Sequence, residues 1–515
     1  MTAHLHETGT GTGTGEDGVN TLQAWRTGID THQEPVVYMR RDCPVCRSEG
    51  FTTQARVQLT AGRRSIVATL SVVDGDWLAE NVAGLSESAW ASLGAQPGQL
   101  VTVTHAPPLD SLSHVRAKVY GNALGGAEFS AIISDVAAGH YSDLHLATFI
   151  TACAGDRLDL AETVSLTKAM IGVGDRIDWG RPLVVDKHCV GGLPGNRTTP
   201  LVVAIAAANG LVMPKTSSRA ITSPAGTADT METLAPVDLD LDTLRRVVQA
   251  EGACLAWGGA MHLSPADDIF VRVERELDID TEGQLIASVL SKKIAAGASH
   301  VVIDIPVGPT AKVRSLDAAR HLATRLVAVA AHFGLGLRCL FTDGSQPVGR
   351  GIGPALEARD VLAVLRGEPD APADLRERAA LVAGAVLEMG GVVAEGAGVQ
   401  RALDTLDSGQ AWDKFQRICQ AQGGLREPPQ AAHVKPLRAG HAGRVIHIDN
   451  RKLSRLAKLA GAPDRPAAGV HLQVRLGDEL AAGQPLLFLH AQTPGELGYA
   501  LDYARDAGDI IRVEA

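Results

Sequence analysis

The sequence predicts a central α/β domain, preceded by a small β-rich domain and a helical segment and followed by a C-terminal α+β domain. Between residues 179 and 430, short β-branched runs alternate with helical patterns, which is typical of a parallel sheet covered by helices. Residues 35–108 and 431–515 instead contain short apolar stretches separated by turn residues. With 515 residues, the chain is long enough to bury more than one hydrophobic core.

The N-terminal third contains a polar tail, a β-rich domain and helices. Residues 1–34 are polar, include the Thr-Gly repeat of Thr8–Gly15 and show no signal-sequence pattern, so we expect them to be disordered. Apolar stretches such as Ser65–Leu70 predict strands in residues 35–108. Residues 109–178 have a mostly helical pattern.

The α/β domain opens with two strands that are each followed by a polar loop and a helix. Leu183–Val185 is a β-branched run, and Pro200 opens a helical pattern that Gly210 closes. Leu211–Met213 restarts a strand, and a second helix begins near Thr227. We expect the two loops to lie side by side at the carboxyl ends of their strands, where α/β proteins bind ligands.

Both loops have the composition of an oxyanion site. Glycines allow close backbone approach, hydroxyls donate hydrogen bonds, and a lysine in the first loop and an arginine in the second supply positive charge near a helix N-terminus. The same residues also occur in ordinary turns and helix caps, but two such loops in tandem favour a phosphate site. The candidate residues are Lys187, Gly191, Gly192, Gly195, Thr198 and Thr199 in the first loop and Ser217, Ser218, Arg219, Thr222, Ser223 and Thr227 in the second.

A later helix and loop supply further polar candidates. In the predicted helix Gln284–Ala295, Ser288 and Lys292 lie one turn apart on a common face, whereas Lys293 points elsewhere. The buried-type strand at 301–305 then leads to Lys312, a plausible contact at a strand's carboxyl end.

Three other patterns are weaker. Asp267 and Asp268 resemble a catalytic carboxylate pair, but after Pro265 they fit the start of a helix better. The stretch 344–353 lacks the third glycine of a dinucleotide-binding fingerprint, so we reject a Rossmann cofactor. The pair Cys43 and Cys46 has metal-ligand spacing, but no second pair accompanies it, which disfavours a zinc site.

Composition predicts a soluble enzyme of the cytoplasm. The net charge of -10 disfavours a nucleic acid or an anionic membrane as partner. No apolar segment reaches the roughly 18 residues that a membrane span requires. Seven cysteines without a disulfide pattern fit a reducing compartment.

The two loops and the Ser288–Lys293 segment resemble the thymidine and pyrimidine-nucleoside phosphorylase family. The similarity runs from about Leu112 to the C-terminus. Within the family, the chain resembles the branch that includes AMP phosphorylase in the sequence of its second loop and in the insertion Leu193–Asn196. The resemblance implies that a helical domain, formed by residues 109–178 and completed by about 266–297, lies across a cleft from the α/β domain. It also implies a homodimer or higher homo-oligomer, no metal or cofactor, and inorganic phosphate as co-substrate.

The resemblance also implies roles for individual residues. Phosphate would be held by Lys187, Cys189, Thr199, Ser217 and Thr227, the base by Ser288 and Lys292, and a proton would come from His188. The AMP phosphorylase branch adds Gly192, Ser218, Arg219, Ala220, Ile221, Thr222, Ser223 and Lys312 as substrate contacts and Asp280 as the proton donor.

Two points stay open within this resemblance. The acid is either His188, whose ordinary pKa needs little tuning, or Asp280, whose pKa must be raised for donation at neutral pH. Cys189 stands where most of the family has serine, and we interpret it as a tolerated near-isostere, with an altered substrate preference as the alternative. We also expect a positively charged site to lower the pKa of this thiol and make it sensitive to oxidation.

We therefore predict a pentosyltransferase that cleaves the N-glycosidic bond of a nucleoside with inorganic phosphate. One alternative is a nucleoside 5′-monophosphate phosphorylase, for which Arg197, Arg219 and Lys312 are spare cations for a second anion site. Another is a phosphoribosyltransferase of the same architecture, which would need acidic metal ligands such as Asp267 and Asp268. A third is a non-enzymatic binding module built on the terminal β domains.

Overall fold

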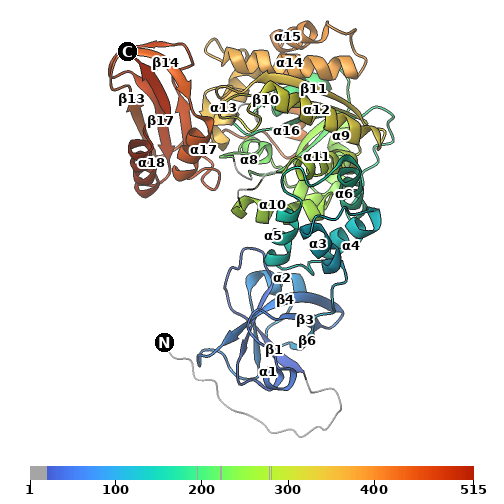
Figure 1. Cartoon of the computed structure of the whole chain (residues 1–515). Coiled ribbons are helices and arrows are strands. Elements are labelled where there is room, and N and C mark those ends of the chain that lie inside the picture. Colours follow the sequence, from blue (N-terminus) through green and yellow to red (C-terminus); the bar gives the residue numbers. More distant parts are fainter. Residues whose placement is uncertain (1–19, 194, 196, 221–222, 278, 280) are drawn as a thin grey trace. The chain divides into compact units, whose positions relative to one another are not determined.

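The computed structural model describes residues 20–193, 195, 197–220, 223–277, 279 and 281–515 (Figure 1). Packing divides the chain into two compact units. The first comprises the residues up to Val119 together with Ser134–Phe149, and the second comprises Tyr120–Ile133 together with Ile150–Ala515. None of the helices among these residues is long and apolar enough to cross a membrane.

The N-terminal part of the first unit is a closed six-stranded barrel with strand order β1-β5-β2-β4-β3-β6. Its elements are β1 (Thr21–Arg26), β2 (Val36–Arg40), α1 (Pro44–Glu49), β3 (Arg56–Ala61), β4 (Arg64–Val73), β5 (Val82–Leu85), α2 (Glu87–Leu93) and β6 (Leu100–His105). Alternate residues of β3 are buried, so Val57 and Leu59 point into the barrel core. Cys43 and Cys46 are buried in this core, and the backbone N–H of Cys46 donates to the Cys43 sulfur at 3.1 Å.

The predicted disorder of residues 1–34 is wrong for residues 20–34. Strand β1 pairs with β5 and β6, and its residues Leu22 and Ala24 are buried in the barrel. Only these two positions of the short strand are apolar and buried, so its period-two signal was too weak to be separated from the polar tail before it. The earlier part of the tail, residues 1–19, lies outside the described residues.

Four helices follow the barrel, as the sequence predicted for residues 109–178. They are α3 (Ser111–Val119), α4 (Gly126–Ala137), α5 (Asp143–Ala152) and α6 (Leu160–Gly172). Helix α6 begins with a capping box in which Asp159 accepts from the Glu162 backbone N–H at 2.7 Å. It packs closely against α11 (Glu282–Ala295), so this later segment joins α6 within the second unit.

The α/β domain is built on parallel strands in the order β11-β10-β7, with the parallel pair β8-β9 beside β7. The backbone N–H of Val185 donates to Val212 at 2.9 Å just before β8 begins. The elements are β7 (Val185–Cys189), α7 (Thr198–Ala208), β8 (Met213–Ser217), α8 (Thr227–Glu232), α9 (Leu241–Glu251), β9 (Ala253–Trp257), α10 (Pro265–Leu277), β10 (His300–Val307), α12 (Leu316–Ala331) and β11 (Gly336–Asp343). The predicted β-loop-α-β-loop-α unit is confirmed.

Both strands of this unit run further than predicted. Strand β7 includes Asp186 and Lys187, which we assigned to the loop because of their polarity. These side chains are buried because each has buried polar partners, which makes a charged residue tolerable inside a strand. Strand β8 likewise continues beyond the predicted Leu211–Met213 stretch, through Pro214 to Ser217.

Helix α7 lies at the centre of this domain. Its residues Thr198 to Ala207 are all buried, as expected of a helix that is apolar on every side. It packs against α13 (Pro354–Arg366), α14 (Ala373–Met389), α15 (Gly398–Asp407) and α16 (Gln410–Ala421). These contacts fix the start of α7, and with it the end of the first loop.

The C-terminal part contains two antiparallel sheets, β12-β15-β17-β13 and β16-β14-β18. Its elements are β13 (His433–Arg438), β14 (Gly443–Ile448), α17 (Asn450–Leu459), β15 (Gly469–Leu472), β16 (Glu479–Leu480), β17 (Pro485–Ala491), α18 (Pro494–Asp506) and β18 (Ile511–Glu514). The short β12 (Gly351–Ile352) comes from the α/β part of the chain and pairs with β15. The first sheet is therefore built from both parts of the chain.

Candidate functional site

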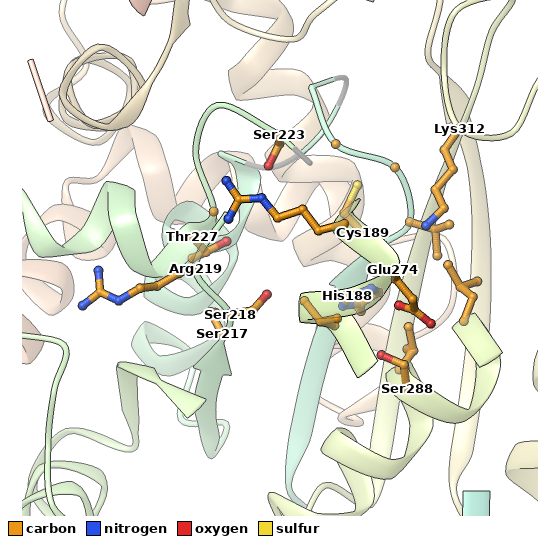
Figure 2. Close-up of a pocket in the computed structure, with 18 of the residues that line it drawn as sticks. His188, Cys189, Ser217, Ser218, Arg219, Ser223, Thr227, Glu274, Ser288 and Lys312 are labelled. Carbon is orange, nitrogen blue, oxygen red and sulfur yellow. The ribbon is translucent and has the colours of Figure 1, made fainter. Parts of the chain in front are cut away.

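A pocket of about 1110 Å³ lies at the carboxyl ends of β7 and β8. Its walls also include α10, α11, the loop after β10 and one face of α17. Figure 2 shows Ser217, Ser218 and Thr227 on one side of the pocket and Ser288 and Lys312 on the other. The structure thus brings the two predicted loops and the predicted Ser288 helix to one cavity.

Lys187 is the most completely buried cation of this pocket. Its side chain is 0% exposed, and its Nζ donates to the Oγ1 atoms of Thr198 at 2.7 Å and Thr199 at 3.0 Å. Burial lowers the pKa of Lys187. An ammonium has three donors, so this geometry leaves one hydrogen for an oxyanion bound in the pocket.

A second buried charge cluster lies beneath the pocket. Asp186 is 2.8 Å from the Nζ of Lys293 and 3.6 Å from the Nζ of Lys215. Burial opposes ionisation of Asp186, but the two lysines hold the pKa of this carboxyl below its usual range. Burial and the charge of Lys293 place the pKa of Lys215 well below its ordinary value. These three residues lie far apart in the sequence, and only the folded chain brings them together.

The second loop is held in shape by Asp229. This carboxylate accepts from the backbone N–H groups of Ala220 at 2.6 Å and Gly226 at 2.9 Å. A Cβ atom at Gly226 would come within 2.7 Å of the Ser218 carbonyl oxygen, so only glycine fits there. The Oγ of Ser217 is buried and has no hydrogen-bond partner among the described residues, as expected of a group that receives a ligand.

Other predicted loop residues also border the pocket. Ser223 lines it, and its Oγ donates to the Ala225 carbonyl at 2.8 Å. Gly191 has a φ of 126°, and a Cβ atom there would lie 3.1 Å from Cβ of Lys312. Gly192 has a φ of 66°. The predicted contacts Ile221 and Thr222, and the predicted acid Asp280, lie outside the described residues.

Two of the three supposed spare cations have carboxylate partners, so neither of them is spare, although Arg219 lines the pocket. Arg197 is fully buried, and its Nη2 lies 3.4 Å from Glu357. Arg219 pairs with Glu232 at 2.6 Å and stacks on Trp257 at 5.0 Å. Figure 2 shows the Arg219 guanidinium turned away from the other pocket side chains. The third cation, Lys312, lines the pocket.

Both lysines of α11 have a carboxylate partner. The Nζ of Lys292 donates to Asp267 at 2.5 Å, whereas Lys293 faces Asp186. Burial alone would lower the pKa of Lys292, but Asp267 raises it above the ordinary value. Ser288 and Lys292 line the pocket as predicted, and the ion pair keeps Lys292 charged there.

Asp267 and Asp268 lie in the first turn of α10, where the sequence placed them. Asp267 forms an ion pair with Lys292 at 2.5 Å. Asp268 lines the pocket, and burial together with the charge of Asp267 raises its pKa to about 6. The sequence did not single out Asp268 as a titratable pocket residue, because its environment arises from packing.

His188 has a pKa well below its ordinary value, which corrects the expectation that it needs little tuning. Burial is the main cause, and the charges of Lys293, Lys215, Lys292 and Lys187 add to it. The imidazole is therefore neutral at neutral pH in the ligand-free protein. A bound phosphate would offset part of the lysine charge and raise this pKa.

The expectation that the site lowers the pKa of Cys189 is also wrong. Burial and the neighbouring carboxylate of Asp304 raise the pKa of this thiol, and they outweigh the nearby lysine. A raised pKa leaves less thiolate at neutral pH, so the reason given for oxidation sensitivity does not apply. A Cβ atom at Gly195 would come within 2.5 Å of the Cys189 sulfur, which shows how tightly the loop covers it.

We expect Cys189→Ser to retain activity, because a hydroxyl is nearly isosteric with the thiol and donates more strongly. Phosphate saturation curves of the two proteins check this. A variant that folds but loses activity would show that the thiol has a role of its own.

Two family matches place the chain among the glycosyl transferases. Residues 181–412 match the family described as "Glycosyl transferase family, a/b domain", and residues 113–174 match its "helical bundle domain". A protein of Acidovorax sp. (strain JS42) named "Putative thymidine phosphorylase 2" is 72% identical and is aligned over 100% of this chain and 99% of its own. A "Putative thymidine phosphorylase" of Parvibaculum lavamentivorans is 68% identical over 96% of this chain and 98% of its own.

The chain belongs to the thymidine and pyrimidine-nucleoside phosphorylase family. A solved structure of anthranilate phosphoribosyltransferase from Thermus thermophilus covers 60% of this chain and 98% of its own, with 22% identity and a TM-score of 0.48.

Proposed function

We propose that the protein cleaves the N-glycosidic bond of a nucleoside by phosphorolysis, releasing the free base and a pentose 1-phosphate. The observation that carries this proposal is the buried Lys187, held by Thr198 and Thr199 at the meeting point of two polar loops. A buried cation with hydroxyls around it suits an inorganic phosphate ion. The names of the relatives agree with this reaction.

In the proposed reaction, phosphate binds to Lys187 and to the hydroxyls of Thr199, Ser217 and Thr227. A phosphate oxygen attacks the anomeric carbon and inverts it, while the carbon–nitrogen bond breaks and its electron pair passes to the base. Holding phosphate in line with this bond supplies most of the rate acceleration. The reaction uses inorganic phosphate as co-substrate and no cofactor.

The base is proposed to lie against α11, where Ser288 and the charged Lys292 line the pocket. A proton must reach the departing base, and Asp280 and His188 are the candidates. In the ligand-free protein the pKa of His188 lies well below its ordinary value, so His188 donates as an imidazolium only if bound phosphate raises this pKa. The phosphoribosyltransferase alternative is not favoured, since Asp267 is paired with Lys292.

The substrate assay incubates the enzyme with thymidine, uridine, AMP, CMP or UMP, with and without phosphate. Chromatography of the released bases then identifies the substrate. The proposal expects base release from at least one nucleoside only when phosphate is present. Release that does not depend on phosphate would indicate a hydrolase and contradict it.

A nucleoside 5′-monophosphate is the second candidate substrate, and one face of α17 favours it. Arg451, Arg455 and Lys458 recur at helical spacing and line the pocket. Among the described residues, no carboxylate forms an ion pair with Arg451 or Arg455, although Arg455 stacks on Tyr503 at 5.3 Å. With Arg314 and Lys312 nearby in the wall, this face could bind a second phosphate.

If nucleotides are substrates, the double variant Arg451→Gln and Arg455→Gln should lower kcat/KM for the nucleotide about 10- to 100-fold, because charged hydrogen bonds to its phosphate are lost. The kcat/KM for the matching nucleoside should not change. Equal effects on both substrates, or none, would remove α17 from substrate selection.

A further inference from the structure

Three successive backbone carbonyls, those of residues 347–349, accept hydrogen bonds from two arginines. Arg475 donates from Nη1 to the Pro347 oxygen at 2.5 Å and from Nη2 to the Gly349 oxygen at 2.8 Å. Arg197 donates from Nη1 to the Val348 oxygen between them. Segment 347–349 is therefore held by both guanidinium groups at once.

Arg475 comes from the C-terminal part, between β15 and β16. Its Nη2 also pairs with the Asp374 carboxylate at 2.6 Å, and the same carboxylate accepts from the Gly349 N–H at 3.1 Å. The side chain of Gln346 accepts from the Leu476 N–H at 2.9 Å. Segment 347–349 is thus fixed to the C-terminal part through side chains as well as through the β12-β15 pairing.

Arg197, the second arginine that donates to segment 347–349, lies immediately before α7. It is fully buried, with carboxylate oxygens of Glu357 at 3.4 Å and Asp360 at 3.9 Å. A Cβ atom at Gly349 would come within 2.9 Å of Cδ of Arg197, so the segment and the arginine are in tight contact. The next two residues in the chain are the threonines that accept from Lys187.

The first loop has a second attachment to the C-terminal part. Leu193 borders the pocket, but its side chain is buried, and the residue is only 4% exposed. It packs in a hydrophobic cluster with Ile352, Val470 and Leu472, which belong to β12 and β15. The loop is therefore tied to the C-terminal part both at Leu193 and, through segment 347–349, at Arg197.

We propose that Arg475 is a positioning residue for the phosphate site, acting through segment 347–349 and Arg197 on the loop that carries Thr198 and Thr199. This inference rests on the proposed phosphorolysis. It assigns the C-terminal part a role in phosphate binding that is separate from contact with the nucleoside. Without the Arg475 side chain, segment 347–349 and Arg197 are held less firmly, and the start of α7 shifts. Thr198 and Thr199 then hold Lys187 less well.

The test compares Arg475→Met with the wild type in steady-state kinetics. The KM for phosphate should rise about tenfold, because the charged hydrogen bonds to two carbonyls are lost. The KM for the nucleoside should stay unchanged, and Arg475→Lys should restore part of the phosphate affinity. Arg465→Met is the matched control, since Arg465 is an exposed arginine of the same part that pairs with Glu496 at 3.1 Å.

A second measurement keeps the test valid if Arg475→Met folds poorly. Leu193→Ala removes the other attachment, and inorganic phosphate should raise its Tm only at higher concentrations than it does for the wild type. An unchanged phosphate KM in Arg475→Met, or an equal rise in both KM values, would overturn the positioning role while leaving the proposed function intact. If phosphate affected neither turnover nor Tm of the wild type, both proposals would fall.

Discussion

Lys187→Met is expected to lower kcat/KM for phosphate by about 10²–10³-fold, the range seen when one preorganised donor to a developing charge is removed. Methionine keeps the length of the side chain but removes the charge and the hydrogen bonds to Thr198 and Thr199. The effect should appear mainly in the phosphate KM and in kcat, because the base is proposed to lie against α11.

Initial rates at several phosphate concentrations measure this loss. The matched control is Lys435→Met, which removes an exposed lysine of β13 outside the pocket and should behave like the wild type. Circular dichroism and Tm show whether the variant folds. A folded Lys187→Met enzyme with ordinary phosphate saturation would mean that phosphate binds elsewhere.

The second large effect concerns the proton donor. If Asp280 protonates the leaving base, Asp280→Asn should lose about 10²–10⁴-fold in kcat with little change in the phosphate KM. If His188 donates instead, His188→Gln should show that loss. Each variant is measured with the nucleoside and the nucleotide, because the two donors are associated with different branches of the family.

The pH dependence separates the two donors independently. Because the pKa of His188 lies well below its ordinary value, its protonated fraction grows only as the pH falls. Donation from a His188 imidazolium therefore predicts a rate that rises below neutral pH and a pH profile that His188→Gln flattens. Full activity in both variants at every pH would exclude both residues as the acid.

The alternation of strands and helices was enough to predict the α/β unit, because its β-branched runs and the apolar α7 closed by Gly210 are local signals. Strand ends were less predictable. The sequence of β7 ends in Asp186, Lys187, His188 and Cys189, which reads as a polar loop. Its burial depends on partners such as Lys215 and Lys293, which lie far along the chain. Local polarity cannot reveal such tertiary pairing.

The difference between local signals and tertiary pairing also explains which site residues could be predicted from the sequence. Hydroxyls and glycines in a loop carry a local signal, so Ser217, Thr199 and Gly191 were singled out and do line the pocket. Arg197 was misassigned because its partner Glu357 lies 160 residues later. The cationic face of α17 was missed, since its residues reach the pocket only through the packing of the C-terminal part.

Phosphorus NMR of a single reaction tests the central claim most directly. The enzyme is mixed with inorganic phosphate and the nucleoside that the substrate assay identifies, and the spectra are recorded as the base is released. Phosphorolysis predicts that a pentose 1-phosphate of inverted anomeric configuration accumulates in amounts equal to the free base while inorganic phosphate declines. Base that accumulates while the phosphate signal stays constant would contradict the account.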